Sequence, residues 1–380
     1  MDWLTGSKQG EARKLISQLA DSTKRDAASQ SLLKLGADAV PALMEALQTQ
    51  DLNLLLLYQH LLARISPAQP QLIKVLSTAH PVIRGRIIEV FGFSKDKALI
   101  PVLLDALKSE YFTVRAKALW ALAAIGEERT VSDLLPLPKD PEDEVRIAAC
   151  KAVAKVRDPS TFDEITNVLL DDLKIEVRQA AAKALGDTRH PAAIPFLMEA
   201  LRDSYWWYEK EQAVSVLLTA IENMGEAVVD PLIDALADKE GTVRKFAAMI
   251  LSKLGDIRAI EELGMALYDL HHEVGEAAAE ALTKFGSQAV DILIESLNHP
   301  EAAIREHAVT ALGKIQDVRV APVLIEMLHD PDRVVQKKAM ASLANLRDER
   351  AIPALRQIAE NRADREMSAL AKQLLNDITQ

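Results

Sequence analysis

The most reactive side chain in this sequence is its single cysteine, Cys150. It is followed by Lys151, whose ammonium group could lower the pKa of the thiol and make it a nucleophile. The residues around it are mainly small and apolar, and a lone cysteine in such a setting is usually a small buried side chain. We therefore predict a structural role for Cys150. A single cysteine also excludes an internal disulfide and a zinc site built on cysteine pairs.

Metal chemistry would have to use the few histidines that stand beside glutamate. His272-Glu273 and the reversed pair Glu306-His307 are far short of the ligands that a two-metal centre needs. We predict no metal site and place His271 and His272 in a solvated turn. The stretch GKIQDVR lacks the glycines and the Ser/Thr of a phosphate-binding loop, and no catalytic triad can be assigned from spacing. The sequence predicts no catalytic residue and no cofactor.

The overall composition indicates a soluble, folded protein. Apolar residues make up 49% of the 380 residues and charged residues 27%, while the net charge is −11. A protein that binds duplex DNA usually presents a basic face, so we expect no nucleic acid partner. The N-terminus lacks the pattern of a signal peptide, and no apolar run approaches the length of a membrane span. We predict a cytoplasmic protein that does not bind membranes.

A short repeat organises the elements that would carry any site. A Val-Arg or Ile-Arg pair recurs at nearly even spacing, with its arginines at positions 84, 115, 146 and 178. The series continues at 244 and 305, and degenerate pairs extend it through the chain. We predict about twelve units that form one array over residues 1–380.

Each unit is predicted to be a pair of helices. After the anchor Val177, small and apolar residues fall three, four, seven and eight positions on, which is one face of a helix. An Asp-x-Arg loop often follows, and its aspartate is suited to cap the next helix. No segment shows the alternation of a strand. A helix pair cannot bury its apolar stripe alone, so we predict an all-α, right-handed solenoid of stacked pairs.

The pattern D-x-x-VR-x-x-AA-x-AL-G, followed by D-x-R-AIP-x-L, resembles the short HEAT-like repeat of bacterial proteins that is called the phycobilisome-lyase type. The resemblance is strongest over positions 96–371 and weaker before them, over positions 1–80. It implies the solenoid fold. It leaves function open, because such repeats serve scaffolds, chromophore lyases and DNA glycosylases alike.

Four adjacent aromatic residues interrupt the regular repeat at 205–208, in a chain that is only 4% aromatic. Tyr205, Trp206 and Trp207 fall in or beside a turn between two helices, and Tyr208 replaces the anchor valine. We keep two interpretations open. The rings anchor a partner, since tryptophan is common at recognition hot spots, or one or two of them fold back over the seam between repeats.

The second helices of the pairs are predicted to line the concave surface of the solenoid. The residue six positions after each anchor should point away from the core, and Trp120, Lys151 and Lys183 hold this place in consecutive repeats. They form a candidate basic and aromatic patch, or are ordinary solvated variation. Prolines within residues 134–141 predict a short or broken helix, which is either tolerated or a kink in the array.

The function predicted from these features is a non-catalytic scaffold or assembly factor that binds a protein on its concave surface. The predicted contacts are Trp120, Lys151, Lys183, Tyr205, Trp206 and Trp207. A phycobilin lyase-type protein acting on a phycobiliprotein and a HEAT-like DNA glycosylase are the alternatives, both implied by the resemblance. A small-molecule ligand is compatible with the sequence but is not predicted.

Overall fold

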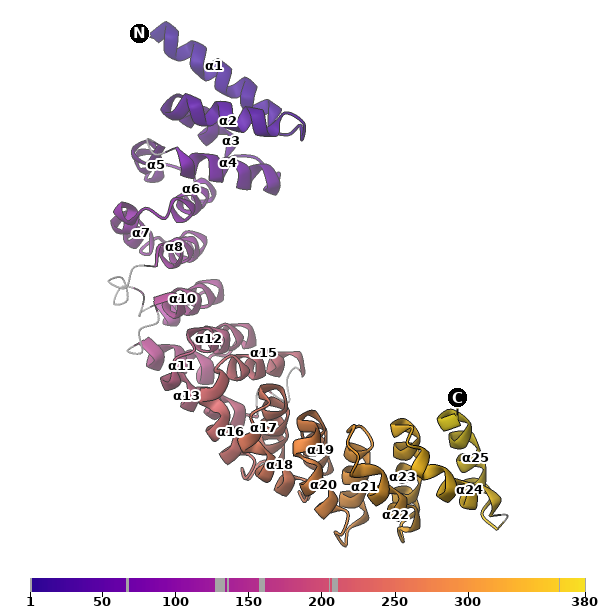
Figure 1. Cartoon of the computed structure of the whole chain (residues 1–380). Coiled ribbons are helices and arrows are strands. Elements are labelled where there is room, and N and C mark those ends of the chain that lie inside the picture. The colour runs from indigo at the N-terminus through magenta and orange to yellow at the C-terminus, as the bar shows by residue number, and fades with distance from the viewer. Residues whose placement is uncertain are drawn as a thin grey trace. The chain divides into compact units, whose positions relative to one another are not determined.

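The structure of the chain is a computed structural model (Figure 1). It describes residues 2–65, 68–126, 134, 137–156, 161–204, 206, 211–361 and 363–379. All regular secondary structure in these residues is helical, which confirms the all-α solenoid prediction. The chain divides into two compact units, Met1–Ala193 and Ile194–Gln380. That the repeats form one array over 1–380 stays a prediction.

The first unit stacks helix pairs in two layers, with α4, α6, α8, α10 and α12 packed side by side as the second helices. Its helices are α1 (Asp2–Gln18), α2 (Arg25–Leu35), α3 (Val40–Ala46), α4 (Leu52–Arg64), α5 (Ala68–Leu76), α6 (Pro81–Ser94), α7 (Ile100–Ala106), α8 (Phe112–Ile125), α10 (Asp143–Val156), α11 (Phe162–Asp171) and α12 (Ile175–Thr188).

The second unit repeats this arrangement, with α15, α17, α19, α21, α23 and α25 as the second helices. Its helices are α13 (Ile194–Arg202), α15 (Glu211–Glu222), α16 (Val229–Ala235), α17 (Gly241–Leu254), α18 (Ile260–Ala266), α19 (His272–Phe285), α20 (Val290–Ser296), α21 (Ala302–Leu312), α22 (Val320–Glu326), α23 (Arg333–Leu346), α24 (Ile352–Glu360) and α25 (Arg365–Thr379). No described helix of either unit is long and apolar enough to cross a membrane.

Alanine-rich stripes explain the close stacking of the second helices. In α12 the predicted core positions Ala180, Ala181, Ala184 and Leu185 are all buried, as is the anchor Val177. Small side chains at these positions let neighbouring helices approach closely, and each buried methyl or methylene group adds about 0.8 kcal/mol of hydrophobic stabilisation. The periodicity read from the sequence therefore places the core correctly.

The Asp-x-Arg loops begin the next helix pair as predicted in most repeats. Asp256, Asp317 and Asp348 each accept a hydrogen bond from the backbone N–H two residues on, and a short 3₁₀ turn follows Asp256 and Asp348. Asp96, which no arginine follows, makes the same bond. The prediction is wrong at Asp187. There α12 continues to Thr188, and the ring of the histidine at 190 accepts the equivalent bond from the backbone N–H of residue 192.

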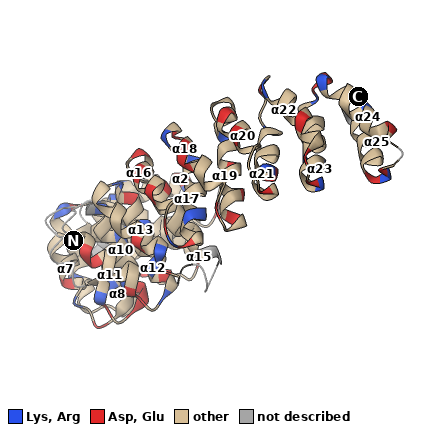
Figure 2. Cartoon of the chain, turned by 90° about the horizontal axis from the view of Figure 1, so that it is seen from below, with Lys and Arg blue, Asp and Glu red and all other residues tan. Residues whose placement is uncertain are grey.

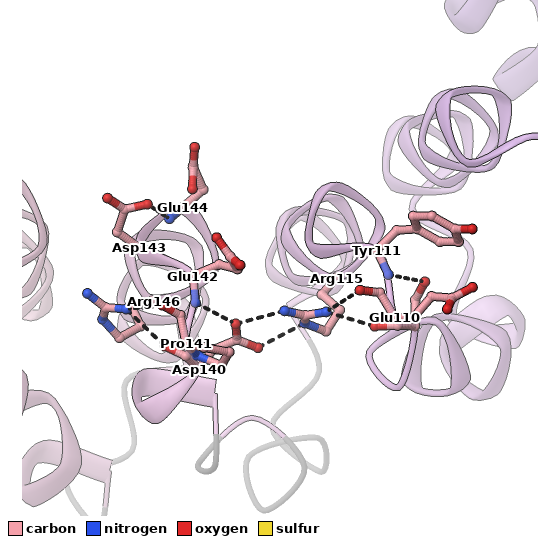
Figure 3. Close-up of polar contacts among 10 residues, drawn as sticks. Glu110, Tyr111, Arg115, Asp140, Pro141, Glu142, Asp143, Glu144 and Arg146 are labelled. Atoms are coloured by element: carbon pink, nitrogen blue, oxygen red, sulfur yellow. Dashed lines mark hydrogen bonds and ion pairs between the residues drawn. The ribbon is translucent and has the colours of Figure 1, made fainter.

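The anchor arginines join successive repeats through what we call the arginine ladder. Each ladder arginine lies second in its anchor pair, and its usual partner is an aspartate in the turn of the next repeat. Arg115 donates two hydrogen bonds of 2.8 Å to the carboxylate of Asp140 (Figure 3). Arg146 donates to the carbonyl oxygen of Asp140 and, through its other nitrogens, to the carboxylate of Asp172. The ladder thus ties one turn to the next.

The proline-rich segment at 134–141 is described only in part. Residues Leu137–Lys139 form a 3₁₀ turn, and α10 then begins at Asp143. Pro136 lies outside the described residues. Leu134 is helical, and its neighbours also lie outside the described residues. A short or broken helix and a kink of the array at this place both stay predictions.

Candidate functional site

Trp120 lies on the outer face of α8, and 42% of its surface is exposed. Its ring rests on α6 at Gly92. A Cβ atom at Gly92 would come within 2.4 Å of the ring, so only glycine lets the indole lie there. The position six residues after the anchor therefore faces outward here, as predicted. The indole is exposed and yet held in place by the neighbouring helix.

Two further rings extend this surface across three helices. The ring of Phe93 on α6 lies 5.1 Å from that of Trp120 in an edge-on arrangement, and the ring of His60 on α4 lies 4.2 Å from that of Phe93. The edge-on contact of Phe93 with Trp120 is a favoured geometry for aromatic pairs, while the rings of His60 and Phe93 are tilted by 38°. We call His60, Phe93 and Trp120 the aromatic row. Neither His60 nor Phe93 was among the contacts predicted from the sequence.

Polar contacts on the same three helices hold the aromatic row in register. The carboxylate of Glu89 accepts a hydrogen bond of 2.7 Å from the side-chain amide of Gln59 and pairs with the ammonium of Lys117 at 3.0 Å. Gln59 is buried and also donates to the carbonyl oxygen of Arg86. The network links α4, α6 and α8, so the row is a preformed surface.

Lys151 and Lys183 are exposed on the next two second helices of the same unit, α10 and α12. The ammonium of Lys183 lies 3.8 Å from the carboxylate of Asp187, one helical turn away. Lys151 has no ion-pair partner among the described residues. The prediction that this position faces outward is correct for both lysines but wrong for Val214 in the irregular repeat, where the side chain is buried.

The aromatic cluster at 205–208 is described at one residue only. Trp206 is completely buried, with 0% of its surface exposed, and its indole nitrogen has no hydrogen-bond partner among the described residues. This corrects its assignment as a surface anchor: the indole fills core volume, as the packing interpretation expected of one or two of the rings. Tyr205, Trp207 and Tyr208 lie outside the described residues.

The side chains considered for catalysis or metal binding are buried or make packing and polar contacts within the fold. Burial raises the pKa of the Cys150 thiol to about 12, so the thiolate that a nucleophile needs is not formed near neutral pH. His271 lies beside Asp269 and Arg244 at the turn before α19. The ring of His272 packs edge-on against that of His307. Within the described residues no cluster of three or more metal-binding side chains occurs.

Comparison with protein families identifies the repeat. A model of HEAT repeats matches five overlapping segments, residues 69–144, 132–218, 216–283, 265–343 and 290–376. The chain belongs to the HEAT-repeat family. The match covers the span in which the anchor pairs and the Asp-x-Arg loops are most regular. No curated protein matches this HEAT-repeat chain significantly in sequence.

Solved structures of the karyopherin Kap121p share the fold. Kap121p bound to Ste12p is 16% identical with a TM-score of 0.59, and the match covers 97% of this chain and 48% of that one. Kap121p bound to the extreme C-terminus of the protein phosphatase Cdc14p is 15% identical with a TM-score of 0.59, covering 97% and 49%. The HEAT-repeat chain therefore spans about half the length of these structures, and the likeness concerns the fold.

Proposed function

We propose that this HEAT-repeat protein is a non-catalytic scaffold or assembly factor that binds a partner protein on the second helices of its first unit. The aromatic row supplies the apolar centre of the contact, with Trp120 as the anchor. Lys151 and Lys183 supply polar contacts beside it. Tyr205 and Trp207 remain predicted partner contacts, whereas the buried Trp206 is not part of the proposed surface.

The observation that carries this proposal is an exposed indole that is already fixed in place. Ordering a flexible side chain on binding costs about 0.5–1.5 kcal/mol. The contacts of the Trp120 ring with Gly92 and Phe93 already order it in the free protein, so most of this cost does not arise on binding. A tryptophan at the centre of an interface commonly contributes ~2 kcal/mol or more. The similar solenoids of Kap121p were solved with another protein, or part of one, bound, which is compatible with the same use of this fold.

The two enzymatic alternatives have less support. Basic and acidic side chains are interspersed along the described helices (Figure 2), and the net charge of −11 opposes binding to DNA phosphates. A tetrapyrrole lyase would need basic groups for propionates beside an aromatic surface, and Lys151 with Trp120 is the nearest approach to that arrangement. Membership of the lyase-type subclass of repeats rests on the sequence pattern alone.

Affinity purification from the native cell, followed by mass spectrometry, tests the proposal. We expect wild-type protein to retain one partner reproducibly and Trp120→Ala to lose roughly thirtyfold in affinity, the equivalent of ~2 kcal/mol. Tyr111→Ala is the matched control, since Tyr111 is similarly exposed, at 40%, but lies in the turn before α8. Equal retention by the wild type and Trp120→Ala would refute the proposed surface, provided that both have the same helical content.

A further inference from the structure

The arginine ladder follows a rule of paired charges in most repeats. Four ladder arginines bind the aspartate of the next turn through two nitrogens each: Arg115 with Asp140, Arg146 with Asp172, Arg244 with Asp269, and Arg305 with Asp330. The sequence also places an aspartate at the matching turn position after Arg25 and after Arg178. A ladder arginine is thus normally matched by an acid.

Three repeats that lack the arginine also lack the acid. The repeat with Glu209 at the arginine position differs, because it keeps Asp238 at the turn, and the Asp238 carboxylate pairs with Arg202 at 2.7 Å instead. The neutral pairs at the same two positions are Asn53 with His80, Gly275 with His299, and Gln336 with Asn361. In each of these pairs the turn residue still caps the backbone, as the aspartate does in the charged pairs. The His80, His299 and Asn361 side chains accept a hydrogen bond from the backbone N–H two residues on. Charge is therefore lost from both partners together.

Arg84 is the exception, because Ser109 stands where its aspartate should be. Ser109 keeps the capping duty, since its hydroxyl oxygen accepts a hydrogen bond of 3.3 Å from the backbone N–H of Tyr111. It supplies no charge. Among the described residues the Arg84 guanidinium donates only to the carbonyl oxygens of Ala79 and Ser77, at 2.8 and 3.1 Å. A half-buried ladder cation is left without its carboxylate.

The unmatched arginine lines a cavity of the first unit between α5 and α7. Its volume is about 730 Å³. Ile88 and Val114 from the second helices form its apolar floor, and Ile73 and Val102 stand on the first helices beside it. Arg84 thus brings unused N–H donors to an open, largely apolar cleft, which we call the α5–α7 cleft.

We propose that the α5–α7 cleft binds a peptide segment of a partner protein through an acidic side chain flanked by apolar ones. The carboxylate binds the Nη1 side of the Arg84 guanidinium, because Nε and Nη2, the nitrogens that hold Asp140 on Arg115, already donate to Ala79 and Ser77 here. The apolar side chains enter the cleft over Ile88 and Val102. A planar guanidinium and a carboxylate form two parallel hydrogen bonds, as four other repeats already show. This site lies beside the first helices and goes beyond the proposed function, because it does not use the aromatic row.

Charges at the rim favour a peptide carboxylate over a phosphate. The ammonium of Lys108 lies 3.9 Å from the carboxylate of Asp105, and Glu110 adds a second acid. Among the described residues, Arg84 is thus the one cation of the cleft without a carboxylate partner. A single unpaired cation suits a ligand group that carries one negative charge. The mixed polar rim also suits the N–H and C=O groups of a peptide backbone.

A synthetic peptide copied from the chain itself is the probe. The blocked peptide Val-Leu-Leu-Asp-Asp-Leu-Lys-Ile reproduces residues 168–175, the turn that supplies Asp172 to the ladder. Its control has asparagine in place of both aspartates. Titration of methyl-labelled full-length protein followed by NMR should shift the signals of Ile88 and Val102. We expect the asparagine peptide and the Arg84→Gln variant each to weaken binding roughly tenfold or more.

Ser109→Asp separates loss of the site from loss of the fold. This variant keeps Arg84 and restores the missing acid, so we expect it to abolish peptide binding while raising the thermal midpoint. Trp120→Ala should leave peptide binding unchanged, and so distinguishes this site from the aromatic row. Absence of methyl shifts at millimolar peptide, or undiminished binding by Ser109→Asp, would overturn the proposal. So would a Glu110→Gln variant that loses as much stability as Arg84→Gln, because Glu110 would then be the partner of Arg84.

Discussion

Replacing Asp330 by asparagine tests the energetic role of the arginine ladder. Arg305 binds the carboxylate of Asp330 through two nitrogens at 2.7 Å, and the two side chains are only 9% and 2% exposed. The remaining nitrogen of Arg305 donates to the carbonyl oxygens of His299 and Pro300, both at 2.8 Å. Asparagine keeps the shape and the cap to the backbone N–H of Asp332 but removes the charge.

The expected loss of stability is large because the arginine stays buried without its counter-charge. Removing one partner of a buried ion pair costs about 3–5 kcal/mol, since the remaining charge has lost its water as well as its partner. The exposed pair of Arg13 and Glu45 joins neighbouring repeats in the same way, with both side chains 61% exposed. Glu45→Gln should cost only about 0–1 kcal/mol.

The measurement must be local, because repeat arrays can unfold in parts. Hydrogen exchange of the amides in α21 and α23 should report the loss at Asp330, together with the urea midpoint of the whole chain. The double variant Arg305→Gln with Asp330→Asn copies the natural neutral pair Gln336–Asn361, and it should recover part of the loss. A loss below about 1 kcal/mol for Asp330→Asn, or one equal to that for Glu45→Gln, would refute the reasoning.

Four further outcomes are expected. The hydrogen bond from Arg305 lowers the pKa of Asp330 from 3.8. The stability that this carboxylate adds to the fold is therefore complete above pH 3.8 and is lost as the pH falls through the folded pKa. Asp330→Asn should flatten the acid limb of a plot of unfolding free energy against pH. Trp206→Ala should cost about 3–5 kcal/mol by urea unfolding. Gly92→Ala should displace the ring of Trp120, shift its indole NMR signal and weaken partner capture. Cys150 should resist a thiol reagent at pH 8 until urea is added, because burial raises the pKa of its thiol to about 12.

Periodicity made the fold predictable, since one rule of spacing applies to most repeats. Small residues at fixed distances from Val177 indicated a buried helix face, and the structure buries that face. The same rule indicated that Trp120 is exposed. It could not decide the orientation of Trp206, because the residues around it break the repeat and a bulky ring can serve the core as well as a surface.

The aromatic row was missed because its members do not share one repeat position. The step from His60 to Phe93 is longer than one repeat and the step from Phe93 to Trp120 is shorter, so a comparison at a fixed spacing does not align them. The row depends on the way neighbouring helices are offset and on the space left at Gly92. Both are properties of packing, and neither is visible in the letters of a single repeat.

The ladder shows how a structure changes what a sequence can reveal. The recurring arginines were evident from the start, but nothing in one repeat indicates that the partner of Arg84 belongs at Ser109 of the next. Once that pairing is known, serine at this position is a conspicuous change, because it preserves the cap while deleting the charge. A half-buried cation without its acid reduces stability unless something else supplies the acid. Local rules in proteins are most often broken where a ligand binds, and this mismatch opens onto a large cavity. Arg84 is therefore the position at which the second partner contact should be sought.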